Sequence, residues 1–145
     1  MSKPRLAIAS DHAGINLKKF LIQEMKEAEF TDFGPEAADS VDYPDFAEKA
    51  CRAVISGKCD RAILICGTGL GMSIAANKIN GIRAAHVESV FTAQMSGEHN
   101  NANVLCLGER VTGTSHALMM ARAWLNANFE IRHQKRVDKI MALEK

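Results

Sequence analysis

Residues 61–78 read RAILICGTGLGMSIAANK, and this stretch predicts the fold around which the rest of the chain is arranged. The run 62–65 is short, apolar and rich in β-branched residues, which is typical of a strand buried on both faces. Cys66 follows, then three glycines within residues 67–71, then small residues that favour a helix. This order aims backbone N–H groups at an anion and would stabilise a thiolate at Cys66. The alternative is a plain tight turn with a buried structural cysteine.

The composition indicates an ordinary globular protein. The 145 residues are 47% hydrophobic and 24% charged, which suits one domain with a substantial core. A formal net charge of +1 gives no general reason to bind nucleic acid or membranes, and no apolar run is long enough for a membrane span. The four cysteines include no Cys-x-x-Cys pair, and no signal peptide is evident. We therefore expect a cytoplasmic protein with reduced thiols.

Strand and helix patterns alternate five times along the chain. Apolar runs predict strands at 5–10, 30–33, 62–65, 82–87 and 104–107. Helical spacing predicts a helix after each strand, and a last helix from about His133 that buries Val137, Ile140 and Met141. This alternation is typical of an α/β fold, a parallel sheet with helices on both faces, in a single domain over 1–145.

Polar residues gather near the predicted strand ends. In folds of this class, ligands bind beyond the carboxyl ends of the strands. The sequence therefore predicts a functional site on one edge of the sheet, formed by the polar clusters Asp11-His12, Cys66–Gly71, His99-Asn100 and Arg110.

Cys66 is the strongest candidate for chemistry. A free thiol has a pKa near ~8.5, which cations and backbone N–H groups lower towards neutrality. Such a thiol can act as a base or as a nucleophile. Cys51 and Cys106 are interpreted as packing residues, because one falls on a helix and the other inside a strand.

Histidines and arginines supply two further candidates. His12 and His99 each stand beside a hydrogen-bonding residue near a predicted strand end or loop, and either could instead be structural. Arg132 and Arg136 are four residues apart, with His133 between them, so they can share one helix face and bind phosphate. The alternative for that cluster is a solvated charged surface. No His or carboxylate spacing indicates a metal site.

Six motifs together resemble ribose-5-phosphate isomerase type B over essentially the whole chain, in the same order. They are Asp11-His12-Ala13-Gly14, Asp42-Tyr43-Pro44, Cys66-Gly67-Thr68-Gly69-Leu70-Gly71, His99-Asn100-Asn101-Ala102-Asn103, Gly108-Glu109-Arg110 and Arg132-His133-Gln134-Lys135-Arg136-Val137. The resemblance implies a Rossmann-like three-layer α/β/α subunit with a five-stranded parallel sheet. It also implies a homodimer with active sites shared between subunits, or a dimer of dimers, and we expect the C-terminal helix (about 133–145) at the interface.

By the same resemblance, the chain would interconvert ribose 5-phosphate and ribulose 5-phosphate through an enediolate, without cofactor or metal. Cys66 would be the base, His99 would open the sugar ring, and Thr68 would assist proton movement. The residues implied to bind the sugar are Asp11, His12, Tyr43 and Asn100, with Gly67, Gly69, Leu70 and Gly71 for the enediolate. The residues implied to bind phosphate are Arg110, Arg132, His133 and Arg136.

Other functions remain open at this point. Galactose-6-phosphate isomerase resembles the same family but divides the Cys66 and His99 motifs between two subunit types, whereas one chain carries both here. The segment 86–91 departs from the family pattern, so tetrulose 4-phosphate, allose 6-phosphate and galactose 6-phosphate are alternative substrates. A dinucleotide-binding module, with Glu88 on the ribose, and a non-catalytic phosphosugar-binding protein are the competing classes.

Overall fold

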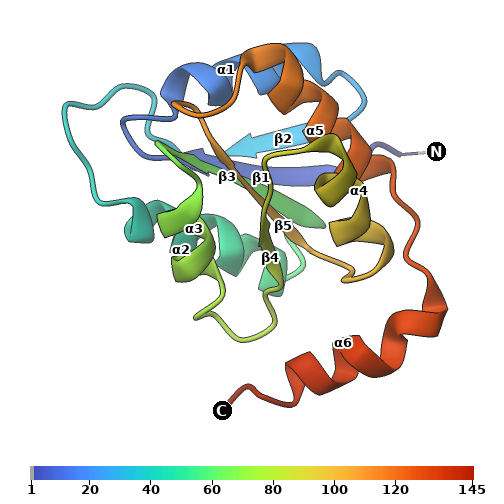
Figure 1. The fold of residues 1–145 in the computed structure, drawn as a ribbon. Helices are drawn as coiled ribbons and strands as arrows, with labels where there is room; N and C mark the ends of the chain where they lie inside the picture. Colours follow the sequence, from blue (N-terminus) through green and yellow to red (C-terminus); the bar gives the residue numbers. More distant parts are fainter. Residues whose placement is uncertain (1) are drawn as a thin grey trace.

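Residues 2–145, the part of the chain that the computed structural model describes, form five strands, six α-helices and one 3-10 helix (Figure 1). None of the helices in this range is both long and apolar enough to cross a membrane. In chain order the elements are β1 (Arg5–Ser10), α1 (Ile15–Glu24), β2 (Glu29–Asp32), α2 (Tyr43–Ile55), β3 (Arg61–Cys66), α3 (Leu70–Ala76), β4 (Ala84–His86), α4 (Val90–Glu98), β5 (Val104–Gly108), α5 (Thr114–Asn126), η1 (Ile131–His133) and α6 (Gln134–Met141).

The strands form one parallel sheet in the order β2-β1-β3-β5-β4. The chain moves from β1 to β2 on one side, and β3 then lies on the other side of β1. Such a reversal leaves a crevice beyond the carboxyl ends of β1 and β3, where ligands bind in open α/β sheets. The predicted α/β class and five-stranded parallel sheet are confirmed.

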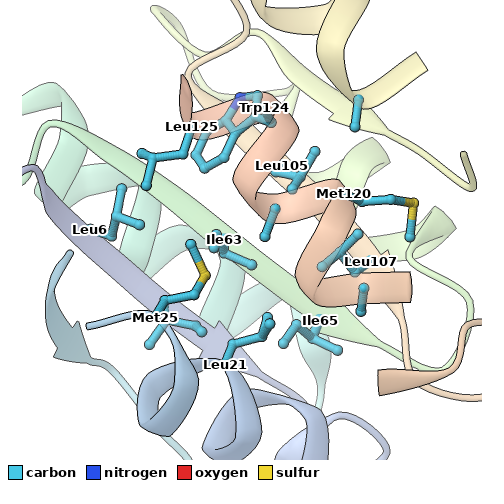
Figure 2. Close-up of a cluster of buried hydrophobic side chains, with 14 of the residues drawn as sticks. Leu6, Leu21, Met25, Ile63, Ile65, Leu105, Leu107, Met120, Trp124 and Leu125 are labelled. Atoms are coloured by element: carbon cyan, nitrogen blue, oxygen red, sulfur yellow. The ribbon is translucent and has the colours of Figure 1, made fainter. Parts of the chain in front are cut away.

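Helices cover both faces of the sheet, as Figure 1 shows. Alternate strand residues point to opposite faces. Leu6, Ile63 and Leu105 therefore pack under α1, α4 and α5, around the fully buried Trp124 (Figure 2). Their neighbours Ala7 and Leu64 pack under α2 and α3 on the other face. Trp124 also donates a hydrogen bond from Nε1 to the Ala102 carbonyl, so the indole nitrogen is satisfied inside the core.

The C-terminal helix differs from the prediction. In α6 only Val137 is buried, whereas Ile140 is exposed and Met141 is partly exposed, so their predicted burial is wrong. The physical reason is that α6 lies apart from the sheet (Figure 1), which leaves one apolar stripe uncovered within the chain. The fourth strand is also shorter than predicted, Ala84–His86 instead of 82–87.

Candidate active site

The crevice between β1 and β3 begins at Asp11. The Asp11 N–H donates to the Ile65 carbonyl at 3.1 Å, which joins the turn after β1 to the end of β3. Gly14 closes the turn against Ile65, where an added Cβ would lie 2.7 Å from the carbonyl oxygen. The Asp11 carboxylate accepts the Ala13 N–H at 2.9 Å and is nearly buried. The carboxylate is therefore held in one orientation at the crevice.

The glycine loop holds the Cys66 thiol in place. Cys66 ends β3, and its Sγ accepts the N–H of Gly69 at 3.1 Å. Gly69 adopts φ 83°, a conformation that side chains rarely allow, and immediately precedes α3. Thr68 is exposed, and its hydroxyl accepts the Leu70 N–H at 3.2 Å. The Cys66 sulfur is therefore nearly buried, with one N–H donor fixed on it.

Three further predicted residues surround this loop or the neighbouring turn. The Tyr43 ring, at the start of α2, contacts Gly71 so closely that an added Cβ would lie 2.5 Å from it. The Arg110 guanidinium lies beside Gly67, 3.3 Å from the position of an added Cβ. His12 accepts the Val41 N–H at Nδ1, at 3.2 Å. The structure therefore brings Tyr43, Arg110 and His12 to the carboxyl edge, near the Cys66 loop or the turn after β1.

Two residues at this edge were missed by sequence reasoning. The carboxylate of Glu109 accepts the Leu17 N–H at 2.6 Å, and its own N–H donates to the Cys66 carbonyl, so Glu109 ties α1 to the loop. His86 ends β4 and hydrogen-bonds from Nε2 to the Thr68 carbonyl at 2.8 Å. Each residue stands at or just after the end of a strand, and Glu109 also lies within the motif Gly108-Glu109-Arg110, but neither position indicated a role.

A second cluster surrounds His99. Its ring lies 4.3 Å from that of His133, centroid to centroid, and its Nε2 lies 3.9 Å from a Glu130 carboxylate oxygen. Arg132 donates to Glu130 at 2.8 Å and holds the pKa of that carboxyl below its usual value. Arg136 donates to His133 Nδ1 at 3.1 Å. Burial, together with the cations around it, lowers the pKa of His133.

The nitrogen and oxygen atoms of His99, Glu130 and His133 lie within 4.8 Å of one another, which is close enough for a metal ion. The hydrogen bonds favour an anion instead. A guanidinium only donates, so His133 Nδ1 is an acceptor and Nε2 carries the proton of the neutral ring. That Nε2 is buried and has no partner among residues 2–145, and Glu130 is already paired with Arg132. The free donors of this cluster suit phosphate.

The two clusters lie at opposite edges of the sheet, so the predicted placement of His99 and Asn100 beside Cys66 is wrong. α4 starts beyond the carboxyl end of β4 and runs back to the amino edge, as helices between parallel strands must. The Asn103 carbonyl accepts the N–H of Ala62, near the start of β3, whereas Cys66 ends that strand. One chain therefore presents the predicted site residues in two separate clusters, one around Cys66 and one around His99.

Comparison with known proteins identifies the class of enzyme. A family model described as "Ribose/Galactose Isomerase" matches residues 6–140. The chain belongs to the ribose/galactose isomerase family. It is 44% identical to ribose-5-phosphate isomerase B of Escherichia coli, over 97% of this chain and 96% of the relative. It is 42% identical to D-erythrulose-4-phosphate isomerase 2 of Mycolicibacterium smegmatis, over 87% and 86% of the two chains.

The fold comparison agrees with this family. The solved ribose-5-phosphate isomerase B of Clostridium thermocellum superposes with a TM-score of 0.93 at 52% identity, over 96% of each chain. The protein is therefore an isomerase of the sugar-phosphate class, and its substrate is a small phosphosugar. The dinucleotide-binding interpretation loses its support, because the glycine loop belongs to an isomerase fold.

Proposed function

We propose that the chain interconverts ribose 5-phosphate and ribulose 5-phosphate, with Cys66 as the base. The observation that carries this proposal is the Cys66 sulfur at the crevice, nearly buried and held by the Gly69 N–H. Isomerisation of an aldose to a ketose needs a base near the working pH and donors directed at a developing oxyanion. Cys66 and the loop of residues 67–71 supply these two elements.

The other cysteines are poorly suited to this role. Burial raises the pKa of Cys51 to about 12 and raises that of Cys106 well above its usual value, so both are neutral thiols near neutral pH. Cys59 precedes β3 and lies at the amino edge, away from the crevice. Cys66 is the cysteine at the carboxyl edge.

The reaction follows from the positions of these groups. The Cys66 thiolate removes the proton from C2 of the open-chain aldose, and the electron pair forms the enediol double bond. The negative charge on O1 is stabilised by the loop N–H groups. Thr68 helps to move a proton from O2 to O1, and the Cys66 thiol then returns its proton to C1. Asp11, His12 and Tyr43 hold the sugar hydroxyls.

The remaining groups come from a second subunit in this proposal. His99 opens the furanose ring and Asn100 binds the sugar, while Arg132, His133 and Arg136, joined by Arg110 of the crevice, bind phosphate. Because His99 and Cys66 lie at opposite edges of one sheet, a single sugar can contact both only between two chains. A homodimer with shared active sites satisfies this condition.

The C-terminal region supports such a dimer. A hollow of about 830 Å³ separates the end of the chain from the β4 side of the sheet, and its lining includes Ala84, Asn100, Ile140 and Leu143. Leu143 is 80% exposed and Ile140 is 44% exposed. An uncovered apolar stripe next to a catalytic candidate is best explained by burial against a partner. We therefore propose that the helix at 133–145 lies at the subunit interface.

A tetrulose 4-phosphate is the second candidate substrate. A relative named as a D-erythrulose-4-phosphate isomerase is nearly as similar to this chain as the Escherichia coli enzyme. The assay that decides is turnover of pentose, tetrulose and hexose phosphates at equal concentration. We expect the highest kcat/KM for ribose 5-phosphate. A higher kcat/KM for a tetrulose phosphate would show that the tetrulose phosphate, and not the pentose phosphate, is the preferred substrate.

The role of Cys66 is tested by proton exchange. In deuterated water, Cys66→Ala should exchange the C2 proton of ribose 5-phosphate at least about 10³-fold more slowly, because the base is lost. Substrate binding should change little. Cys51→Ala is the matched control and should exchange at the wild-type rate, since Cys51 is a packing residue of α2. Exchange unchanged in Cys66→Ala would exclude Cys66 as the base.

A further inference from the structure

The peptide unit between Thr68 and Gly69 is bound on both sides. Its carbonyl accepts a hydrogen bond from His86 Nε2 at 2.8 Å, and its N–H donates to Cys66 Sγ at 3.1 Å. In a trans peptide the C=O and the N–H point in opposite directions. One peptide plane therefore separates His86 from Cys66 and connects them through its two hydrogen bonds.

The direction of the His86 hydrogen bond is set by its partner. A carbonyl oxygen only accepts, so Nε2 of His86 must carry a proton. The imidazole is about one-fifth exposed at the end of the edge strand β4, which limits competition from water. A donor on the carbonyl polarises the whole peptide and makes its N–H a stronger donor to sulfur.

Two glycines make this contact across the sheet possible. β5 lies between β3 and β4, and the loop after β3 must cross its end to reach His86. An added Cβ on Gly108, the last residue of β5, would lie 2.5 Å from the Thr68 carbonyl carbon. An added Cβ on Gly69 would lie 2.7 Å from the His86 ring. The loop, the end of β5 and the imidazole are therefore fitted to one another.

We propose that His86 is a positioning residue that orients and polarises the Thr68–Gly69 peptide, so that the Gly69 N–H holds Cys66 as a thiolate. His86 touches neither the thiol nor, in the proposed reaction, the sugar. The effect on turnover rests on the proposed function, whereas the effect on the thiol does not. The segment 86–91, which departs from the family pattern, thereby acquires a role in the chemistry of the loop.

The two hydrogen bonds that connect His86 to Cys66 through the Thr68–Gly69 peptide form a relay. The charged and titratable groups around this relay come from several elements. A carboxylate oxygen of Glu88 lies 3.7 Å from His86 Nε2, and the Glu88 side chain is 64% exposed. Arg110 lies beside Gly67, and Asp11 is hydrogen-bonded to the end of β3. Cys106 lies on β5, two residues before Gly108, the residue that pairs with Cys66. A direct charge effect of His86 on Cys66 is the competing explanation, and Glu88→Gln tests it.

The main experiment compares His86→Phe with wild type. Phenylalanine keeps a flat ring against Gly69 but cannot donate, so the pH at which half of Cys66 is thiolate should rise by between about 0.4 and 1 unit. This midpoint is read from the ultraviolet absorbance of the thiolate, after subtraction of the same titration of Cys66→Ser. At neutral pH, kcat should fall about 2- to 10-fold with little change in KM. His86→Gln, which can donate, should recover much of both.

The controls separate the relay from general effects of substitution. His116→Phe, on the exposed surface of α5, should leave the midpoint and kcat unchanged. Glu88→Gln should also leave both unchanged if the hydrogen bond acts, and should raise the midpoint if the charge of His86 acts, because the charged imidazole would lose its partner carboxylate. An unshifted midpoint in His86→Phe, or a shift reproduced by Glu88→Gln alone, overturns the proposal.

A measurement on the wild-type protein covers the case in which His86→Phe does not fold. Nitrogen NMR of labelled histidine should show His86 protonated at Nε2 at neutral pH, and a ring protonated only at Nδ1 would overturn the proposal. The proposed function fails separately. A shifted midpoint in His86→Phe, with no turnover of any phosphosugar by the wild-type protein, would support the role of His86 and refute the proposed function.

Discussion

The proposed sharing of each active site between Cys66 of one subunit and His99 of the other predicts that two inactive variants restore each other. Cys66→Ala removes the proposed base, and His99→Asn removes the proposed ring-opening group, so each variant alone should be inactive. In a dimer with shared sites, a mixed dimer has one site in which both residues are intact. Its other site lacks both residues. Mixing the two variants should therefore restore activity.

The geometry excludes a complete site within one chain, and the statistics of subunit exchange then set the size of the effect. Ala62, which binds the His99 segment through Asn103, precedes Cys66 on β3 by about 13 Å of strand. That length exceeds the reach of one pentose phosphate between two groups in direct contact with its reacting carbons. Random exchange of subunits gives about half mixed dimers, each with one intact site of two, so activity should reach about a quarter of wild type.

The assay is ribose 5-phosphate turnover after the two variants are unfolded together and refolded, or after co-expression with different tags. Purified mixed dimers should have about half of wild-type activity. Cys66→Ala mixed with Asp11→Asn is the matched control, because both defects lie in the Cys66 cluster and each site of a mixed dimer has one of them. No activity above background in the Cys66 and His99 mixture would refute the shared site.

Two further predictions concern stability. Lys18 is fully buried and donates to the Asp32 carboxylate at 2.9 Å and to the Pro35 carbonyl, so Lys18→Met should lower the free energy of unfolding by about 3 kcal/mol. Urea denaturation measures this, and the exposed Lys19→Met should change it little. The pKa of His133 is lowered in the folded chain, whereas the unfolded residue titrates near 6.5. The contribution of the neutral ring to stability is therefore complete above pH 6.5, and it is lost as the pH falls through the lowered pKa of the folded chain. The urea midpoint should therefore decrease on acidification, and it should decrease less in His133→Gln; equal slopes in both proteins would contradict this.

Much of the fold follows from local patterns in the chain. The strand runs are recognisable because a strand buried on both faces needs a nearly unbroken apolar stretch, as in 62–65. Cys66 and the glycines were identifiable because a sharp turn at a strand end needs residues without Cβ atoms, as Gly69 with φ 83° shows. The resemblance to the isomerase family rested on these local motifs and is confirmed by the matched family.

The misplacement of His99 has a different origin. Its motif stands between a helix and the next strand, which in a parallel sheet lies at the amino edge, whereas the prediction assigned it to the carboxyl edge. The direction of α4 decides the edge, because the chain must return to the amino side before the next parallel strand. Ile140 and Met141 were predicted as buried from helical spacing, which identifies an apolar stripe but not the surface that covers it.

Local sequence patterns were enough to predict the alternation of strands and helices, the glycine loop, and the placement of Cys66 at a strand end, because each depends on residues close together in the chain. The position of β5 between β3 and β4, the hydrogen bond of His86 to the loop after β3, and the exposure of the apolar residues of α6 became known only from the folded chain. Those relations depend on strand order and helix direction, which are set by packing between residues distant in sequence.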